Sequence, residues 1–559
     1  MSNESTIAGS STKSTIIDAV AVDSDHDEQS DLEIEGESSH APNAASSSSV
    51  GKKKKKKKSK ASKLLDKLKG NGEDRHGDEV PQEVVDQVME EIRTQGTLSP
   101  EELSAESIRQ ALQEMKILEV VKGKAGIGGL NPKDMGEHKF WATQPVPQMG
   151  EGPPEEDGYI EPSRPVDQVR QTPYGLPNGY EWSTLDIQDP DQNKEVYDIL
   201  SRNYVEDDYA AFRFQYSAEF LRWALTPPGY HQEWHIGVRM TSNKKLIAFI
   251  SGVPMMLRVR KNVIPVSEIN YLCVHKKLRS KRLAPVLIKE VTRQCHLKGI
   301  FQAIYTAGVV IPTPVSVCRY FHRSLNIPKL IETKFSYVPR NMTLARMIRV
   351  NKLESKTSLP GLREMEEKDL AHVADLFRRY MQRFDMAPIM TLEEARHNFL
   401  SGKGTGKLGS AGKGRRIGQV TWSYVVEDPE TQKITDFFSF YSLPSTIIND
   451  TKYGTLEAAY LYYYATESAF EPVAEISGQL KQRLTSLIGD ALIVGNEAAF
   501  DVFNALTLMD NVPVLGDLKF GVGDGFLNFY LYNWRTTQLA GMNGVDGQSP
   551  GKGIGVVML

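Results

Sequence analysis

Cysteine is scarce in this chain, with three residues among 559: Cys273, Cys295 and Cys318. An odd and sparse set without the spacing of metal ligands excludes a disulfide framework and a zinc site, and it indicates a reducing compartment. Long hydrophobic runs are also missing, since no stretch of about 18 consecutive apolar residues occurs, so we expect no transmembrane helix and no integral membrane association. The N-terminus lacks an apolar signal core, which predicts a cytoplasmic protein.

An excess of charge of one sign is lacking too, since 67 Lys and Arg residues face 71 Asp and Glu residues, for a net charge of −4. Any attraction to nucleic acid or to a membrane must therefore be local. Hydrophobic residues make up 40% of the chain and charged residues 25%, which is typical of a soluble globular protein with polar extensions. The length exceeds what one core normally holds, so we expect two or more folded units.

Residues 1–78 are rich in serine, then acidic, then strongly basic, and we expect them to form a disordered leader because they cannot bury enough apolar surface. The basic part contains seven consecutive lysines, Lys52–Lys58. One interpretation is that these lysines bind ribosomal RNA or another anionic surface. The other is a localisation signal or a solubilising tail. Residues 79–130 carry two amphipathic helical patterns and are predicted to be a helical linker segment.

From residue 131 onward the patterns are those of a mixed α/β protein. Residues 234–254 predict two paired strands joined by a short turn. Residues 281–298 predict a helix that ends before a glycine. The polar stretch 351–361 contains Pro-Gly and is a plausible boundary between two halves, and the Gly- and Lys-rich segment 401–416 is expected to be a mobile surface loop.

The most informative stretch is Glu268–Ala284. Its nearly continuous apolar run, Ile269–Val274, predicts a strand that is buried on both faces. Five cations then precede a helical apolar pattern: Lys276, Lys277, Arg279, Lys281 and Arg282. A strand, a cationic turn and a helix N-terminus together make an anion site, so we predict a phosphate-bearing cofactor. From charge alone, a solvated loop or a localisation signal is an open alternative.

The spacing Arg279-x-x-Arg282-x-Ala284 resembles the Arg-x-x-Gly-x-Ala pyrophosphate loop of acyl-CoA-dependent N-acetyltransferases. Arg282 stands where that loop has glycine, which normally lets the backbone approach the phosphate. An acetyl-CoA-dependent N-acetyltransferase therefore stays an open reading of this motif.

Longer segments resemble the glycylpeptide N-tetradecanoyltransferases (N-myristoyltransferases) of the fungal type with a lysine-rich leader. Glu268–Val274 and Lys519–Trp534 are similar to the two signature segments of that family. The likeness covers roughly 131–559 and includes further segments: 138–147, 212–214, 305–310 and 436–446.

The resemblance implies an α/β fold with mixed (α+β) sheets and two pseudo-symmetric acyl-CoA N-acyltransferase halves of the acetyltransferase type. Residues 131–350 would bind acyl-CoA, and 351–559 would contribute the peptide groove and the catalytic C-terminus. The implied reaction transfers myristate from myristoyl-CoA, as co-substrate and without a metal, to the N-terminal glycine of peptides and nascent proteins. A non-catalytic ribosome- or RNA-binding protein acting through Lys52–Lys58 is the alternative from another class.

The resemblance assigns the chemistry to main-chain and side-chain groups of five residues. The amides of Tyr271 and Leu272 would stabilise the oxyanion, provided that the strand bulges there instead of making ordinary ladder bonds. Asn270 and Thr306 would orient the amine. The α-carboxylate of Leu559 would be the base.

The last residues, 553–559, are an apolar run after a Gly-rich connector that begins at Gly541. Most chain ends are polar and frayed, so this pattern predicts a tail that docks back into the protein. Burial would raise the pKa of its terminal carboxylate and make it a stronger base. A purely structural tail strand is the alternative.

The resemblance also assigns binding residues. Those for CoA and the acyl chain are His138, Lys139, Phe140, Trp141, Tyr271, Leu272, Cys273, Val274, Arg279, Ser280, Lys281, Arg282, Leu283 and Ala284. Those for the peptide are Glu206, Asp207 and Asp208, as an acidic patch for a basic side chain, together with Tyr320, His322, Tyr337 and Asp524. Without the resemblance, the acidic patch reads as solvated surface.

Overall fold

The computed structural model describes residues 138–148, 150–206, 211–412, 414–448, 450, 452–541 and 553–559. These residues belong to one compact unit. Several expectations concern parts of the chain outside the described residues: the leader 1–78, the segment 79–130, Asp207, Asp208 and most of the Gly-rich connector.

One long sheet of 13 strands runs through the described residues. Its strands, in spatial order, are β1 (Tyr180–Thr184), β3 (His235–Met240), β4 (Leu246–Val259), β5 (Asn262–Val274), β6 (Gln302–Ala307), β16 (Gly521–Tyr532), β7 (Ser316–Ser324), β15 (Val502–Leu506), β14 (Ala458–Thr466), β11 (Ile434–Ser442), β10 (Thr421–Glu427) and β8 (Leu362–Glu364). The thirteenth strand, β9 (Met386–Ile389), pairs with β4 off this path. A small second sheet contains β2 (Phe212–Phe214), β12 (Ser445–Ile447) and β13 (Thr455–Leu456).

From either edge of the long sheet, parallel and antiparallel strand pairs follow one another in the same order. Among the described strands, β5·β6 and β14·β15 pair in parallel, and each pair is joined by a helix, α6 or α11. On both sides, antiparallel strands lead from the parallel pair to the sheet edge. The antiparallel pair β16·β7 lies at the centre of this arrangement. The predicted mixed α/β fold is confirmed, and the repeat of one strand order shows two related halves.

The two halves exchange a strand. β16 comes from the end of the sequence but pairs with β6, and Asn528 lies opposite Ala307. β7 lies in the predicted first half, 131–350, but pairs with β15, and His322 lies opposite Asn504. Each half of the sheet is therefore completed by a strand from the other half of the sequence.

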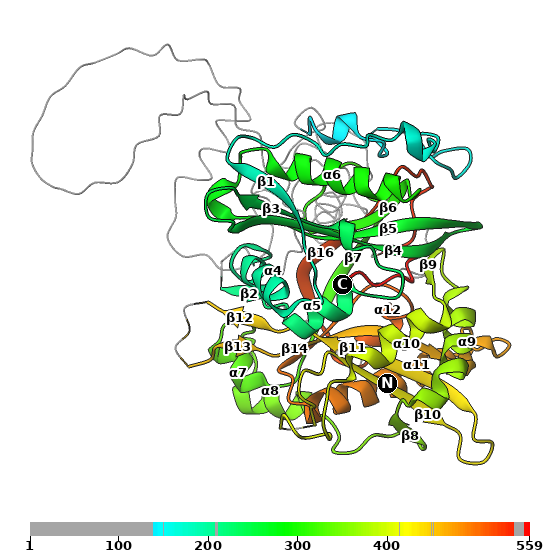
Figure 1. Ribbon diagram of the computed structural model, residues 1–559. Coiled ribbons are helices and arrows are strands. Elements are labelled where there is room, and N and C mark those ends of the chain that lie inside the picture. Colours follow the sequence, from blue (N-terminus) through cyan, green and yellow to red (C-terminus); the bar gives the residue numbers. More distant parts are fainter. Residues whose placement is uncertain are drawn as a thin grey trace, which may run out of the picture. The chain divides into compact units, whose positions relative to one another are not determined.

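Helices cover both faces of the sheet (Figure 1). α6 packs on one face of β4 and β5, and α4 and α5 pack on the other. The α-helices are α4 (Pro190–Asn203), α5 (Ala218–Leu225), α6 (Leu283–Leu297), α7 (Ile327–Glu332), α8 (Leu344–Asn351), α9 (Leu370–Met381), α10 (Leu392–Leu400), α11 (Gln479–Glu497) and α12 (Val512–Leu515). Short 3₁₀ helices are η2 (Trp141–Thr143), η3 (Val166–Gln168), η4 (Gln232–Trp234), η5 (Lys276–Leu278), η6 (Glu367–Asp369), η7 (Ser401–Lys403) and η8 (Glu467–Phe470).

Local chemistry explains where these helices start. Asp189 caps α4 by accepting from the amides of Asp191 and Gln192, and Pro190 occupies the first helical position.

The predicted strand pair in 234–254 is confirmed. The helix predicted for 281–298 begins at Leu283, two residues later than expected, because Arg282 adopts a left-handed φ of +56° before it.

Two arginines hold the C-terminal end of the segment 401–416 against the rest of the protein. Arg416 makes two hydrogen bonds to Glu364, of 2.5 and 2.6 Å. Arg415 donates to Glu457 at 2.7 Å.

The predicted boundary 351–361 connects α8 to β8. No helix among the described residues is both long enough and apolar enough to cross a bilayer.

Candidate active site

Strand β5 bulges at Tyr271. The register on β5 advances three residues, from Asn270 to Cys273, while the register on β4 advances two, from Ser251 to Phe249. Tyr271 has a φ of +58°, a left-handed conformation that a non-glycine residue keeps only where the surrounding structure holds it. The predicted bulge is confirmed.

The extra residue changes which face each side chain meets. Because side chains alternate along a strand, one inserted residue reverses the faces of those that follow. Tyr271 packs against Tyr204 and Tyr216, at ring-centroid distances of 6.0 and 5.1 Å. Leu272 lies in the core on the opposite face, beneath α6. The main-chain amides of these two residues thus leave the regular ladder geometry.

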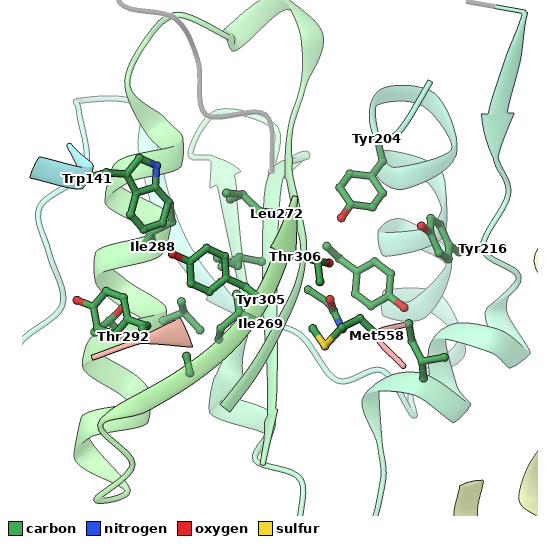
Figure 2. A pocket seen from close by; sticks show the side chains of 17 residues that line it. Trp141, Tyr204, Tyr216, Ile269, Leu272, Ile288, Thr292, Tyr305, Thr306 and Met558 are labelled. Atoms are coloured by element: carbon green, nitrogen blue, oxygen red, sulfur yellow. The ribbon is translucent and has the colours of Figure 1, made fainter. Parts of the chain in front are cut away.

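A cavity of ≈ 740 Å³ opens beside the bulge. The parallel pairing of β5 with β6 ends at Ile269 and Tyr305, so the two strands separate where the cavity begins. Figure 2 shows Trp141 at one end of the cavity and Met558 at the other, with Tyr305 between them. Trp141 stacks on Tyr305 at 5.5 Å, which makes one wall aromatic. Most of the side chains that line this cavity are apolar, which suits an aliphatic chain.

All five residues predicted to carry the chemistry line this cavity: Asn270, Tyr271, Leu272, Thr306 and Leu559. They come from β5, from β6 and from the last residue of the chain. The fold therefore brings the two motif strands and the chain end to one place.

The C-terminal tail is docked, as the sequence predicted. Ile554 and Val556 are fully buried, and Val557 and Met558 are nearly so. Gly555 lies against Phe384, where a Cβ atom would come within 2.9 Å of the ring. The tail ends between the strands of the two halves, where Figure 1 marks the C-terminus.

A carboxylate that the sequence analysis left unassigned lies beside the chain end. Glu268, on β5, accepts a hydrogen bond of 2.7 Å from the Asn270 side-chain amide, and the main-chain amide of Leu559 also donates to it. Burial raises the pKa of Glu268 to about 7, and these two hydrogen bonds oppose the rise. An acid within an apolar strand was visible in the sequence, but its partner on the tail was not.

A second cavity, of ≈ 480 Å³, meets the first at the chain end. Tyr216, Met558 and Leu559 line both cavities. The second cavity also contains Tyr320, one of the predicted peptide residues, and Asn504. Leu559 thus lies where the two cavities meet.

Neither His322 nor Asp524 lines the second cavity, but His322 contacts Asn504 of its lining and Asp524 acts electrostatically on His322. His322 Nδ1 is 2.7 Å from Asn504 Oδ1. Burial lowers the pKa of His322, and Asn504 and Asp524 oppose that effect. Tyr337 is exposed and lines neither cavity.

Glu206 is already paired within the chain. It accepts hydrogen bonds from Arg213 Nε and from Lys276 Nζ, each at 2.5 Å. Burial acts to raise the pKa of Glu206, and the two cations outweigh it and lower that pKa. A basic peptide residue would have to compete with both cations for this carboxylate.

The predicted phosphate loop joins β5 to α6. Ser280 and Arg282 have φ values of +67° and +56°, so a residue other than glycine adopts the left-handed conformation that glycine usually supplies. Arg279 donates to the main-chain oxygen of Asn203 at 2.5 Å. The loop is thereby tied to the end of α4, and the N-terminus of α6 follows directly, where no side chain caps the helix.

Several predicted cofactor residues turn their side chains into the core. Cys273, Val274, Leu283 and Ala284 are all buried, so they can meet a cofactor only through the main chain. Among His138–Trp141, Trp141 lines the first cavity. Among the described residues, no group of three or more His, Cys, Asp or Glu side chains is arranged to hold a metal ion.

Known proteins match this chain over most of its length. The family model "Myristoyl-CoA:protein N-myristoyltransferase, N-terminal domain" matches residues 159–318, and the model for the C-terminal domain matches residues 332–557. The glycylpeptide N-tetradecanoyltransferase of Emericella nidulans is 52% identical over 463 residues, which is 82% of this chain and 90% of that protein.

The enzyme of the same name from Saccharomyces cerevisiae is 48% identical over 436 residues, 76% of this chain and 93% of that protein. A crystal structure of the Saccharomyces cerevisiae N-myristoyltransferase with bound myristoyl-CoA is similar in fold, with a TM-score of 0.71 and 47% identity. The match covers 76% of this chain and 100% of that one.

Proposed function

Because this chain belongs to the myristoyl-CoA:protein N-myristoyltransferase family, it transfers myristate from myristoyl-CoA to the N-terminal glycine of proteins, and we propose that its own chain end is the base of that reaction. The observation that supports this mechanism is the position of Leu559, which lines both cavities and faces the bulge of β5. The acyl chain would occupy the first cavity and the peptide the second, so the thioester and the glycine amine would meet at the junction.

The amine nitrogen attacks the thioester carbonyl carbon, and negative charge develops on the carbonyl oxygen. The main-chain amides of Tyr271 and Leu272 stabilise this oxyanion, where one such donor contributes on the order of 10²–10³ in rate. The α-carboxylate of Leu559 takes the proton that the amine loses. The carbon–sulfur bond then breaks, and CoA leaves as a thiolate that takes up the second proton lost by the nitrogen as the amide forms.

The pKa values suit this proton transfer. An α-ammonium has a pKa of about 8 and a free α-carboxylate one of about 3.5. Burial of a docked chain end would raise the pKa of its carboxylate and bring it closer to the pKa of the ammonium. Asn270 and Thr306 would orient the amine between the two groups, since both line the first cavity.

The phosphates of CoA would bind at the turn between β5 and α6, where cations and helix amides coincide. Arg279, Ser280, Lys281 and Arg282 form that turn. His138 to Phe140 precede Trp141, so their main chain lies close to the same cavity. The peptide would contact Tyr320, with His322 and Asp524 behind it, and Tyr337 and the acidic segment 206–208 would lie further along.

Incubation of the protein with a peptide that begins with glycine, supplied with both myristoyl-CoA and acetyl-CoA, tests the transfer. Mass spectrometry should find myristate on the N-terminal amine. A matched peptide that begins with alanine should remain unmodified. Transfer of acetate in place of myristate would instead identify an ordinary acetyltransferase.

We further propose that the protein is cytoplasmic and that the leader attaches it to ribosomes. The three cysteines are free and buried, and burial raises their thiol pKa values to about 12, which suits a reducing compartment. Lys52–Lys58 supplies a dense local positive charge in a chain of the fungal type.

Deletion of residues 1–78 tests the role of the leader. The truncated protein 79–559 should keep its rate of acyl transfer, because every residue of the candidate active site remains. It should lose sedimentation with ribosomes, and the binding of the full chain should weaken steeply with salt because counterions are released. Equal ribosome binding by both proteins, or loss of acyl transfer on truncation, would contradict this division of roles.

A further inference from the structure

Glu268 is a buried carboxylate on β5, between β4 and β6, and no ion pair among the described residues includes it. Its partners across the ladder are Val253 on β4 and Ile304 on β6, and only 7% of the residue is exposed. Its hydrogen-bond donors are neutral, namely the Asn270 amide and the Leu559 main chain. A buried carboxylate without a cation lowers stability, and an apolar residue would serve a purely structural position better. Its presence therefore calls for a role other than packing.

The two donors to Glu268 both come from residues that line the first cavity. Asn270 lies at the start of the bulge, and Leu559 is the residue proposed to supply the base. The α-carboxylate carbon of Leu559 is two bonds from the amide nitrogen that Glu268 holds. One carboxylate thus fixes both the amide that orients the amine and the main chain that carries the base.

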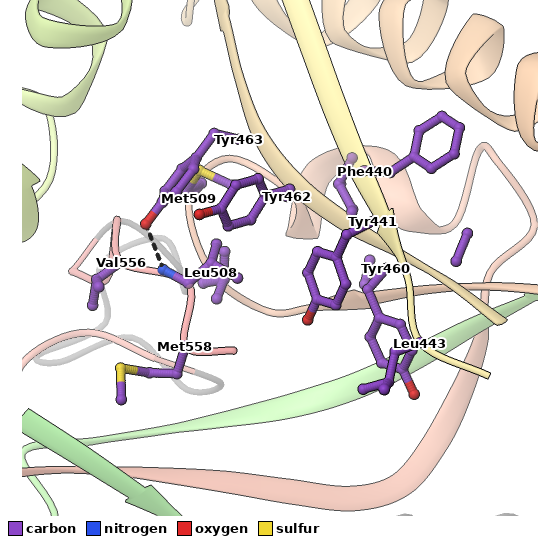
Figure 3. Packing of buried hydrophobic residues seen from close by; sticks show 14 of the residues in the cluster. Phe440, Tyr441, Leu443, Tyr460, Tyr462, Tyr463, Leu508, Met509, Val556 and Met558 are labelled. Carbon is purple, nitrogen blue, oxygen red and sulfur yellow. Dashed lines mark hydrogen bonds between the residues drawn. The ribbon is translucent and has the colours of Figure 1, made fainter. Parts of the chain in front are cut away.

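The tail reaches this point through alternate amides. The amide of Gly555 donates to the Met386 main-chain oxygen at 2.7 Å. The amide of Val557 donates to the Tyr463 hydroxyl at 3.1 Å (Figure 3), and the amide of Leu559 donates to Glu268. The first two bonds set how deeply the tail is docked. The third is the last restraint before the chain end, where a terminus otherwise frays.

We propose that Glu268 is a positioning residue for acyl transfer: by holding the Leu559 amide and the Asn270 side chain together, it sets the distance between the terminal carboxylate and the amine. The inference rests on the proposed role of the Leu559 carboxylate. Glu268 itself touches neither reacting atom.

The charge of Glu268 matters for this grip, because the ionised carboxylate is the stronger acceptor for both donors. The titratable groups that face it are the hydroxyls of Tyr462 and Tyr463 on β14, whose pKa values Glu268 raises together with burial, and the α-carboxylate of Leu559. Since the pKa of Glu268 is about 7, its hydrogen bonds to the Asn270 side chain and the Leu559 amide should weaken as the pH falls through neutrality.

Glu268→Gln tests the inference, because glutamine has nearly the same shape but no negative charge. Single-turnover acyl transfer should slow on the order of 10- to 100-fold, as small displacements of catalytic groups do. The affinity for myristoyl-CoA should change less than twofold. The advantage of the unmodified protein over Glu268→Gln should shrink as the pH is lowered from 8 to 6, which a purely structural defect would not produce.

Asp490→Asn is the matched control. Asp490 is also a buried carboxylate that accepts from two main-chain amides, those of Ser358 and Leu359, at 2.7 and 2.9 Å. It lies on α11, away from both cavities. Its substitution should alter thermal unfolding without slowing transfer. An equal loss of rate in both variants, or a Glu268→Gln protein with unchanged rate and pH profile, would overturn the inference.

Tyr463→Phe provides a second variant that leaves Glu268 in place. It removes the acceptor of the Val557 amide, two residues before the chain end, so the rate should fall in the same direction but by less. This variant keeps the inference testable even if the Glu268→Gln protein does not fold. If the Tyr463→Phe protein is folded and transfers myristate as fast as the unmodified protein, the position of the tail does not control the rate, and the inference is refuted.

A semisynthetic chain with a C-terminal amide separates this inference from the proposed base. If Glu268 acts through the Leu559 carboxylate, adding Glu268→Gln to the chain with the C-terminal amide should lower the rate of acyl transfer little further. Full activity of the amide chain would refute the base itself. An inactive amide chain together with a fully active Glu268→Gln protein would refute only the role of Glu268.

Discussion

At the scale of single residues, the candidate active site depends on where three oxygen-bearing groups sit relative to one bulge. Asn270, Glu268 and the end of Leu559 are joined by hydrogen bonds or by a shared cavity wall. Neither carboxylate is paired with a cation among the ion pairs of the described residues, and burial raises the pKa of Glu268. Two measurements follow from this arrangement.

Removal of Leu559 should reduce turnover by about 10²–10⁴, the usual contribution of a general base, since the new carboxylate on Met558 ends the chain one residue short. Myristoyl-CoA should still bind, as the cavity walls remain. The comparison is Leu559→Ala, which keeps the main-chain carboxylate and should cost far less. Steady-state kinetics and calorimetric titration measure both. Equal losses for the deletion and the substitution would assign the effect to the leucine side chain.

Glu268 should make the protein less stable as the pH rises. Its pKa is about 7 in the folded protein, against an ordinary value of 4.5. Between these two values the folded state holds more protons than the unfolded state, so the free energy of unfolding falls with rising pH. The full effect is about 3 kcal/mol. Urea unfolding between pH 5 and pH 8 should show Glu268→Gln gaining on the unmodified protein by up to this amount, whereas parallel curves would contradict the burial of a titrating carboxylate.

At the scale of elements, the bulge of β5 is the device that turns a core strand into part of a site. It places Tyr271 at a φ of +58° and reverses the alternation of β5, so that Val266 before it and Cys273 after it lie in the same core. It lies where β5 and β6 separate, so a cavity opens beside displaced amides. The cost of this conformation can be measured at Tyr271.

Tyr271→Gly should be more stable than Tyr271→Ala by about 1 kcal/mol, because glycine adopts a positive φ without strain. Both variants lose the same packing against Tyr204 and Tyr216, so the difference isolates the backbone. At Val266, a regular and buried position of β5, the order should reverse, since glycine weakens an ordinary strand. Urea midpoints for the four variants decide it; alanine more stable than glycine at Tyr271 would mean that the bulge is unstrained.

At the scale of the whole molecule, strand exchange makes the two halves depend on each other. β16 separates β6 from β7, and β7 separates β16 from β15. Fragments that end at residue 350 or begin at residue 351 should therefore be unfolded when produced alone, since each exposes unpaired strand edges. Circular dichroism and limited proteolysis of each fragment, and of the mixture, test this. A fragment that unfolds cooperatively on its own would contradict the dependence.

The sequence by itself determined the local elements and the chemical family. The apolar run Ile269–Val274 and the cations after it were enough to predict a buried strand, a basic turn and a helix, because these patterns depend on neighbours in the chain. The motif segments identified the reaction, and the apolar end 553–559 predicted a docked tail. The division into residues 131–350 and 351–559 stays a prediction.

Only the tertiary structure decided which distant groups meet. The exchange of β7 and β16, the junction of two cavities at Leu559 and the contact between Glu268 and the last amide all join residues far apart in the sequence. Periodicity and spacing report only on neighbours along the chain. The same limit explains Glu206, which looked available for a peptide until the fold placed Arg213 and Lys276 against it.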